Sequence, residues 1–219
     1  MAFYNDNMVM KVTVIGGGFS GISASCYLAR AGHQVTLVER LNRLGGRATS
    51  FKDSGYRFEM GPSWYWMPEV FEAFFKDFDQ PVPYRLTRLD PQYTIHFPHD
   101  TVKIPARLEE TVKIFESKEV GAGEELKHFM DRATKKYQLA MGGPVEKPSL
   151  SVFEYLDRDS LKLARPSSII SQRKLVRKSF KDHRLQTILE WPVLFLGGHP
   201  KKVPGLYSVM NHADLIGGT

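Results

Sequence analysis

A glycine-rich turn between two apolar segments constrains this chain more than any other feature. Residues 11–15 form a short apolar run typical of a buried parallel strand, and the next residues, Gly16-Gly-Gly-Phe-Ser-Gly21, fit the pattern G-x-G-x-x-G. Residues 22–31 predict a helix, and residues 33–38 predict a second strand that Glu39 closes. Strand, glycine turn, helix, strand and acid in this order predict a dinucleotide-binding βαβ unit.

Each residue of this turn suits contact with a pyrophosphate. Gly16 allows a tight turn, Gly18 lacks a Cβ and lets the backbone approach phosphate oxygens, and Gly21 lets the helix pack closely on the strand. The first N–H groups of the helix and its positive dipole end favour phosphate binding. We therefore expect the cofactor-binding residues to include Gly16, Gly18, Phe19, Ser20 and Gly21.

An acid follows at the distance expected for ribose recognition. Glu39 lies 18 residues after Gly21 and can accept hydrogen bonds from a ribose diol, whereas its charge repels a 2′-phosphate and disfavours NADP. The neighbouring Arg40 joins Glu39 among the expected cofactor-binding residues. A glycine-rich turn that binds no ligand is the alternative, but it does not explain the strand, helix and acid around the turn.

A second pair of glycines follows at Leu44-Gly45-Gly46-Arg47-Ala48. Two glycines and a guanidinium fork can form another phosphate contact, although a solvated arginine in a surface loop fits the same letters. In this position the segment resembles the second FAD fingerprint of the amine-oxidase and carotenoid-desaturase superfamily, which NAD dehydrogenases do not usually carry. The resemblance implies FAD as the cofactor, held in part by Gly45, Gly46 and Arg47.

Further segments resemble phytoene desaturases of the bacterial type, within the carotenoid desaturase family. The segment Gly55-Tyr-Arg-Phe-Glu-Met-Gly-Pro-Ser63 and the aromatic run that follows it carry the resemblance, as do residues 191–197 and 206–212. In the family the first of these segments lies near the flavin, which implies cofactor contacts for Gly61, Pro62 and Ser63. Glu59 stands where the family usually has Asp, and we expect it to have a structural or FAD-ordering role.

The resemblance also implies a fold and a domain organisation. The fold class is α/β, with a Rossmann-like FAD-binding part of the GR2 type followed by the start of an α+β substrate domain. We expect a flexible extension at residues 1–9, the FAD-binding part at 10–85, and a substrate- and membrane-associating part at 86–219. Because members of the family are considerably longer, we expect the chain to be the N-terminal part of a longer enzyme, whose C-terminal part is a missing partner.

Hydrophobic periodicity predicts further elements. A strand is expected at residues 51–58, and a helix at residues 68–78 carries an apolar stripe that is typical of a core-facing helix. Two short strands flank Pro98-His99-Asp100 and predict a hairpin. More helices are expected at residues 109–116, 124–139, 151–156 and 182–191.

The resemblance implies FAD-dependent desaturation of a long carotenoid, with phytoene converted towards lycopene by hydride transfer to the flavin. Two alternatives remain open: a related carotenoid oxidoreductase that acts on another polyene, and a non-catalytic, truncated remnant that binds FAD or a partner chain without turnover. A plain NAD dehydrogenase is less consistent with the second fingerprint. No residue spacing identifies a catalytic residue.

Composition limits the remaining possibilities. Hydrophobic residues make up 42% and charged residues 25% of the 219, as in ordinary folded proteins, and no run of 18 apolar residues predicts a transmembrane helix. The single cysteine, Cys26, is expected to be a packing residue and suits a reducing cytoplasm. The seven histidines show no zinc-type spacing, so no metal site is expected.

Residues 165–202 are strongly basic, with nine Lys or Arg against two acids. Around residues 173–181, basic and apolar residues alternate in a pattern that suits the surface of an anionic membrane. A solvated helix face with an apolar underside is the alternative. No nucleic-acid-binding motif accompanies the segment, so we expect a peripheral membrane surface and no nucleic acid among the partners.

Overall fold

A computed structural model describes residues 8–61 and 64–218 of the chain. These residues form two compact units, which divide between Val82 and Pro83. The predicted extension at residues 1–9 lies largely outside the described residues. The assignment of an FAD-binding part and a substrate-associating part to the two sides of residue 85 stays a prediction.

The first unit begins with the expected βαβ arrangement. Strand β1 (Lys11–Ile15) and strand β2 (Gln34–Val38) pair in parallel, with Thr13 opposite Thr36, and helix α1 (Phe19–Arg30) connects them. The helix starts three residues earlier than predicted because the extended backbone of Gly18 serves as its N-cap. Phe19 and Ser20 therefore belong to the first helical turn.

Residues 51–58 form two strands, and the prediction of one strand is wrong. Strand β3 (Ser50–Asp53) and strand β4 (Tyr56–Glu59) pair antiparallel around a two-residue turn. Both turn residues, Ser54 and Gly55, have positive φ angles of 48° and 84°, as in the tight hairpin turns that match the strand twist. The Ser-Gly pair was the signal in the sequence for this reversal.

Helix α2 (Pro68–Asp77) closes the first unit and brings its aromatic stripe onto helix α1. Phe71 packs edge-on against Phe19, with ring centroids 5.6 Å apart, and Phe74 packs in the same way against Tyr27 at 5.8 Å. No residue of α2 is fully buried, so the stripe forms an interhelical contact rather than a closed core.

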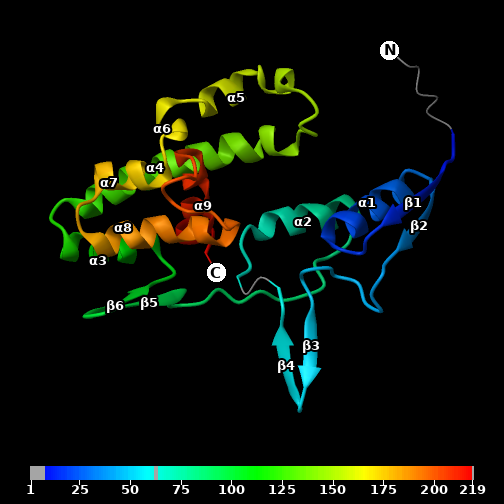
Figure 1. The fold of residues 1–219 in the computed structure, drawn as a ribbon, viewed down its shortest axis with the longest axis horizontal. Coiled ribbons are helices and arrows are strands. Elements are labelled where there is room, and N and C mark those ends of the chain that lie inside the picture. Colours follow the sequence, from blue (N-terminus) through cyan, green and yellow to red (C-terminus); the bar gives the residue numbers. More distant parts are fainter. Residues whose placement is uncertain (1–7, 62–63, 219) are drawn as a thin grey trace. The chain divides into compact units, whose positions relative to one another are not determined.

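The second unit joins a hairpin to a group of helices, shown from green to red in Figure 1. Strand β5 (Tyr93–Phe97) and strand β6 (Asp100–Ile104) form the predicted hairpin. Helix α4, the longest helix of the described chain, packs against α3 and α9. The α-helices of this unit are α3 (Leu108–Lys118), α4 (Ala122–Met141), α5 (Arg158–Leu163), α6 (Pro166–Ile169), α7 (Gln172–Ser179), α8 (His183–Glu190) and α9 (Val209–His212).

Shorter 3₁₀ turns and one π-helix complete the second unit. One of the 3₁₀ turns takes the place of the helix expected at residues 151–156, and a capping box of Ser151 and Glu154 fixes its start. The turns are η1 (Pro144–Glu146), η2 (Val152–Tyr155), η3 (Trp191–Leu196) and η4 (Gly205–Ser208), and the π-helix is η5 (Ala213–Gly217).

The hydrophobic core lies in the second unit. Three rings form its centre, because Phe180 packs edge-on against both Phe115 and Phe129 at centroid distances of 5.6 and 6.1 Å. Helices α3, α4, α7 and α8 and the β5–β6 hairpin all contribute to this cluster. In the first unit, by contrast, none of the described hydrophobic residues is fully buried, and 86% of Ile15 is exposed.

Candidate cofactor site

The two predicted glycine motifs lie against each other at the end of strand β1. The amide of Gly16 donates to the carbonyl of Val38 at 2.8 Å, which holds the first turn beside the end of strand β2. The amide of Gly45 donates to the carbonyl of Gly17 at 2.7 Å, which holds the second motif on the first. Backbone hydrogen bonds thus join segments that lie about 30 residues apart in the sequence.

Close backbone approach explains several of these glycines. A Cβ added at Gly21 would lie 1.9 Å from the carbonyl oxygen of Gly16, and one added at Gly46 would lie 3.0 Å from the Cα of Gly18. At Gly61 it would lie 2.5 Å from the carbonyl oxygen of Arg47. Larger residues at these positions would therefore push the motifs apart.

A cavity of about 1090 Å³ opens between the two motifs. The predicted site residues that line it are Gly16, Gly18, Phe19, Ser20, Gly21, Gly45, Gly46, Arg47 and Gly61. Neither Glu39 nor Arg40 lines this cavity, and Pro62 and Ser63 lie outside the described residues. The structure thus brings nine of the predicted residues to one place.

Glu39 supports the first turn beside the residues that line the cavity. Its carboxylate accepts hydrogen bonds from the amide of Gly17 at 2.6 Å and from the amide of Leu41 at 2.8 Å. The bond from Leu41 and then the bond from Gly17 hold the pKa of Glu39 below its ordinary value. The carboxylate is therefore ionised at neutral pH, and each oxygen keeps a lone pair for a further donor such as a ribose hydroxyl.

Sequence reasoning missed several lining residues, of which Arg43 matters most. Its guanidinium donates to the carbonyl of Ser50 at 2.7 Å and so reaches across the loop between strand β2 and strand β3. Arg43 lies two residues before Gly45, so its closeness to the second motif was the available signal. The other lining residues that were missed are Ile15, Leu41, Ala48, Thr49 and Met60.

The residues around the cavity fit a dinucleotide. Gly18 shows the open space that a phosphate needs, because a Cβ there would meet only the Cα of Gly46, at 3.9 Å. The first turn of helix α1 presents backbone N–H groups, Arg43 and Arg47 supply positive charge, and no carboxylate lines the cavity. An anionic pyrophosphate between these groups would meet donors on both sides.

Other candidate residues lie away from this chemistry. Glu59 pairs with Arg57 at 2.8 Å on the exposed hairpin β3–β4 and does not line the cavity. Cys26 is a half-buried free thiol of helix α1. Among the residues that the structure describes, no three His, Cys, Asp or Glu side chains are grouped as metal ligands. Likewise, no helix in residues 8–61 and 64–218 is long and apolar enough to cross a membrane.

Comparison with curated proteins finds carotenoid desaturases. The chain is 39% identical over 208 residues to a carotenoid 3,4-desaturase from Haloarcula japonica, and 29% identical over 215 residues to a 4,4′-diapophytoene desaturase from Staphylococcus aureus. The alignments cover 93% and 95% of this chain but 42% of each relative, so the chain spans less than half the length of these relatives. The predicted resemblance to carotenoid desaturases is confirmed.

Comparison with solved structures shows the fold, and comparison with family models shows the family. An oxidoreductase from Methanosarcina mazei aligns with a TM-score of 0.58 over 95% of this chain and 44% of its own, and its 17% identity shows the fold alone. The sequence pattern of flavin containing amine oxidoreductases matches residues 19–208. These findings confirm the predicted fold class and the predicted cofactor, FAD. The chain belongs to the flavin-containing amine oxidoreductase family.

Proposed function

We propose that the protein to which this chain belongs catalyses the FAD-dependent desaturation of a carotenoid. The observation that carries this proposal is the 39% identity to a carotenoid 3,4-desaturase across 93% of the chain. The cavity at the two glycine motifs supports it, because a desaturase of this kind needs a bound flavin. When bound, the flavin accepts a hydride equivalent and supplies the redox chemistry.

The residues of this chain hold and orient the cofactor. The amides at the start of helix α1 and the guanidinium groups of Arg43 and Arg47 bind the pyrophosphate, while Glu39 accepts hydrogen bonds from the adenosine ribose. Glu39 also fixes the first turn through the amide of Gly17. In our proposal these contacts place the cofactor.

Two substrates are in question. Phytoene, converted towards lycopene, is the substrate implied by the resemblance of residues 55–63, 191–197 and 206–212 to bacterial-type phytoene desaturases. A different carotenoid is the second candidate, and it is favoured by the higher identity to the carotenoid 3,4-desaturase, at 39%, than to the diapophytoene desaturase, at 29%. A carotenoid as substrate class is common to both candidates.

Pigment analysis separates these candidates. The complete reading frame that contains residues 1–219 would be expressed in one host that accumulates phytoene and in another that accumulates lycopene, and the products analysed by chromatography. Phytoene converted to more conjugated carotenoids supports the first substrate, and conversion only in the second host supports the other. A flavin-loaded protein that changes neither carotenoid would refute desaturation of both, and a protein without flavin would favour the non-catalytic alternative.

Cofactor retention tests the binding residues separately. Arg47→Ala and Glu39→Ala should each lower the flavin content of the purified protein, since one removes charge at the cavity and the other frees the first turn. Arg57→Ala is the matched control, because Arg57 is a similarly exposed arginine of the first unit that does not line the cavity. Equal flavin content in all variants would refute the assignment.

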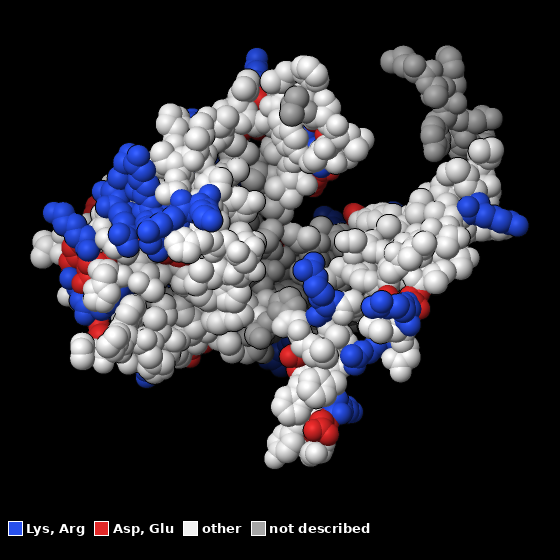
Figure 2. Space-filling view, viewed as in Figure 1, with Lys and Arg blue, Asp and Glu red and all other residues white. Residues whose placement is uncertain are grey.

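We further propose that the second unit meets an anionic membrane through helix α7. Lys and Arg side chains gather over α7 in Figure 2, and a shallow groove there is lined by Ser171, Arg173, Lys174, Arg177, Lys178 and Lys201. The apolar side of α7 is not available for insertion, because Val176 and the adjoining Phe180 are buried in the core. The attraction is therefore electrostatic and should weaken with salt.

The choice of variants matters for this test. Arg173 and Arg177 both bind the buried carboxylate of Glu190, at 2.9 and 3.4 Å, so reversing their charge would unsettle the fold. Lys174 and Lys178 are exposed, and Lys174→Glu with Lys178→Glu should reduce sedimentation with anionic liposomes. The pair Lys113→Glu with Lys127→Glu, on helices α3 and α4, is a control of equal charge change. Unchanged liposome binding by the α7 variant would contradict docking at this helix.

A further inference from the structure

A second cationic site lies in the second unit, where helix α4 passes the segment from α5 to α6. A cavity of about 400 Å³ there is bordered by side chains from all three elements. Its positively charged or hydroxyl-bearing lining residues are Arg132, Lys135, Lys136, Lys162, Arg165 and Ser167. Five of these side chains carry positive charge, and none of the described residues that line the cavity is a carboxylate.

Lys136 is the centre of this site. Only 9% of the residue is exposed, and its ammonium group donates to the carbonyl of Gly205 at 3.0 Å and to the hydroxyl of Ser208 at 3.1 Å. In the described part of the chain it has no carboxylate partner. Burial, and then the nearby charge of Arg132, lower its pKa to about 8. A buried ammonium without an anion is costly, so a third donor remains to be satisfied.

The charges around Lys136 are only partly balanced. Three of the five cations have acidic partners that lie outside the cavity: Arg132 pairs with Glu125 at 3.0 Å, Lys135 with Asp131 at 2.6 Å, and Lys162 with Asp159 at 2.8 Å. Lys136 and Arg165 have none among the described residues. Two positive charges are therefore uncompensated, which matches the charge of about −1.5 to −2 on a phosphate group at neutral pH.

We propose that this cavity binds a phosphate or diphosphate monoester. In this proposal the ammonium of Lys136 donates to the phosphate from helix α4, and Arg165, Lys162 and Ser167 provide donors from the α5–α6 side. A phosphate is a better ligand for these guanidinium and ammonium groups than a carboxylate would be, because a carboxylate carries only one negative charge. The site is separate in sequence from the glycine motifs of residues 16–47, and the proposal does not rest on carotenoid chemistry.

The segment from α5 to α6 borders a second cavity, which suggests that the phosphate could belong either to an amphiphile or to a soluble ester. Other residues of α5 and α6 border a mostly apolar cavity of about 580 Å³, where the buried hydroxyl of Ser168 has no hydrogen-bond partner among the described residues. A phosphate head with an attached hydrocarbon chain would use both cavities, whereas a soluble phosphate ester would use only the cationic one. Both ligands share the phosphate chemistry of the proposal.

Calorimetric titration of the 219-residue chain with pyrophosphate tests the site. Saturating FAD is present throughout, so that the glycine motifs do not contribute. We expect saturable binding that Arg165→Gln weakens about ten-fold and Lys162→Gln weakens about three-fold, because Arg165 has no acidic partner among the described residues whereas Lys162 already pairs with Asp159. Lys136→Met should abolish binding, and its melting temperature shows whether the variant is folded.

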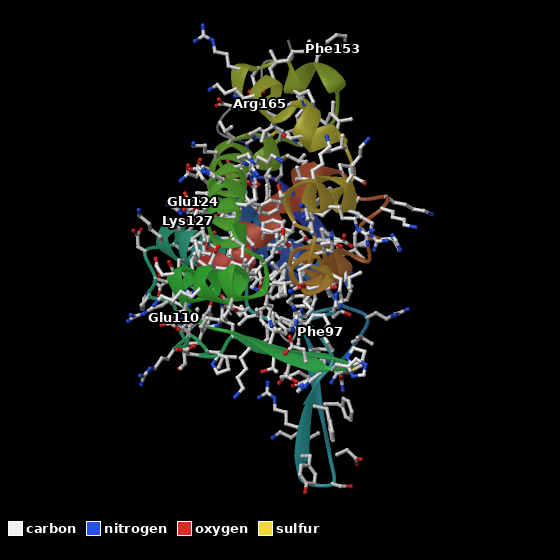
Figure 3. All side chains as sticks on the ribbon, turned by 90° about the vertical axis from the view of Figure 1, so that its left-hand side faces the viewer. Phe97, Glu110, Glu124, Lys127, Phe153 and Arg165 are labelled. Atoms are coloured by element: carbon white, nitrogen blue, oxygen red, sulfur yellow. The ribbon has the colours of Figure 1, made fainter. Side chains whose placement is uncertain are left out.

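Lys127→Gln is the matched control for Lys162→Gln. Both lysines are about half exposed and pair with an acid three residues earlier, at 2.9 Å for Lys127 and 2.8 Å for Lys162. In Figure 3, Lys127 and Glu124 lie near the start of helix α4, away from Arg165. The control should bind pyrophosphate like the unchanged protein. No saturable binding, or an equal loss in Lys127→Gln and Arg165→Gln, would overturn the proposal.

The source of the phosphate is distinguished by two further titrations, one with inorganic phosphate and one with monododecyl phosphate below its critical micelle concentration. Tighter binding than that of inorganic phosphate, with the same loss in Arg165→Gln, indicates the head of an amphiphile. Equal affinity indicates a soluble phosphate ester. Binding of monododecyl phosphate that Arg165→Gln leaves unchanged would place the ligand elsewhere and contradict the site.

Discussion

At the scale of single residues, glycines of one motif meet different needs. At Gly21 a side chain is excluded by the protein itself, because a Cβ would lie 1.9 Å from the oxygen of Gly16. At Gly18 the nearest described atom to such a Cβ is 3.9 Å away, so the protein alone leaves room for it. The need for glycine at residue 18 therefore comes from the ligand, whereas the need at residue 21 comes from packing within the protein. Mutation can separate these two requirements.

Gly18→Ala should therefore leave the fold intact and weaken FAD binding. The added methyl projects into the cavity where the pyrophosphate approaches, and we expect a loss of about ten-fold in affinity, or about 1.4 kcal/mol. Fluorescence titration of the flavin-free protein with FAD measures the effect. Gly143→Ala is the control, because a Cβ there meets nothing within 4 Å and φ is 166°. Equal FAD affinity for Gly18→Ala and the control would contradict this role.

A buried acid in the second unit links stability to pH. Asp214 is fully buried and accepts a hydrogen bond from the hydroxyl of Tyr93 at 2.6 Å, while its other oxygen has no partner among the described residues. Burial raises the pKa of Asp214 from its ordinary value of 3.8 to about 7, and hydrogen bonds from Tyr93 and Trp191 oppose this rise. The folded protein therefore keeps a proton that the unfolded chain releases.

Stability should consequently fall as pH rises from about 4 to about 7 through this group, by about 1.4 kcal/mol per pH unit at most, and stay level above pH 7. Asp214→Asn carries no charge, so its free energy of unfolding should depend less on pH in this range. Denaturant unfolding at pH 5 and pH 8 measures the difference. Asp131→Asn, at an exposed ion pair, is the control, and an equal pH dependence in Asp214→Asn and the unchanged protein would contradict the assignment.

At the scale of elements, the periodicity of apolar residues predicted where helices and strands lie along the chain. It predicted less well which of these elements pack against each other. The period of apolar residues placed α2, α3, α4 and α8 within a few residues of their observed bounds, and Pro98-His99-Asp100 placed the second hairpin. The first hairpin was missed because its turn, Ser54-Gly55, is weaker than Asn-Gly or Asp-Gly. Capping geometry, which sequence reveals poorly, decided where α1 begins.

Helix α7 shows what a sequence pattern leaves open. Alternating basic and apolar residues fit both a membrane-inserted helix and a core-facing helix, and only the contacts separate the two. Val176 and Phe180 are almost completely buried, whereas Lys174 and Lys178 are exposed. The apolar side of the helix belongs to the core, and the basic side remains at the surface. Long-range contacts of this kind cannot be derived from local periodicity.

The ring cluster that α7 leads into should dominate the stability of the second unit. Phe180→Ala removes a ring that is 1% exposed and contacts two other rings, so we expect it to lower the free energy of unfolding by about 3–5 kcal/mol. Phe153→Ala changes a ring that is 75% exposed and should cost less than about 0.5 kcal/mol. Urea unfolding followed by circular dichroism compares them, and similar costs for both variants would show that the core has been misplaced.

At the scale of the whole molecule, the two units differ in how they are stabilised. The core cluster consists of residues of the second unit, from Val102 to Leu215, whereas the first unit has half-exposed aromatic contacts and two separate two-stranded sheets. The βαβ motif could be predicted from sequence because its signals are local. The small amount of apolar burial around it could not, since burial depends on which distant segments cover a surface. The first unit therefore depends more on its ligand.

FAD should accordingly stabilise the first unit selectively. We expect calorimetry of the flavin-free 219-residue chain to show an early transition from the first unit and a later one from the second, and FAD to raise only the early one. A ligand at a hundred times its dissociation constant stabilises the state that binds it by about 2.7 kcal/mol. Hydrogen exchange of residues 8–61 assigns the early transition, because their amides should gain protection with FAD while those of the core helices do not. At the same FAD concentration Gly18→Ala should reduce this stabilisation to about 1.4 kcal/mol, because a ten-fold weaker affinity leaves FAD at ten times its dissociation constant. Phe180→Ala should lower the second transition and leave the effect of FAD on the early one unchanged. If FAD shifted only the second transition, the cofactor would bind the second unit, which would contradict the site proposed at the glycine motifs.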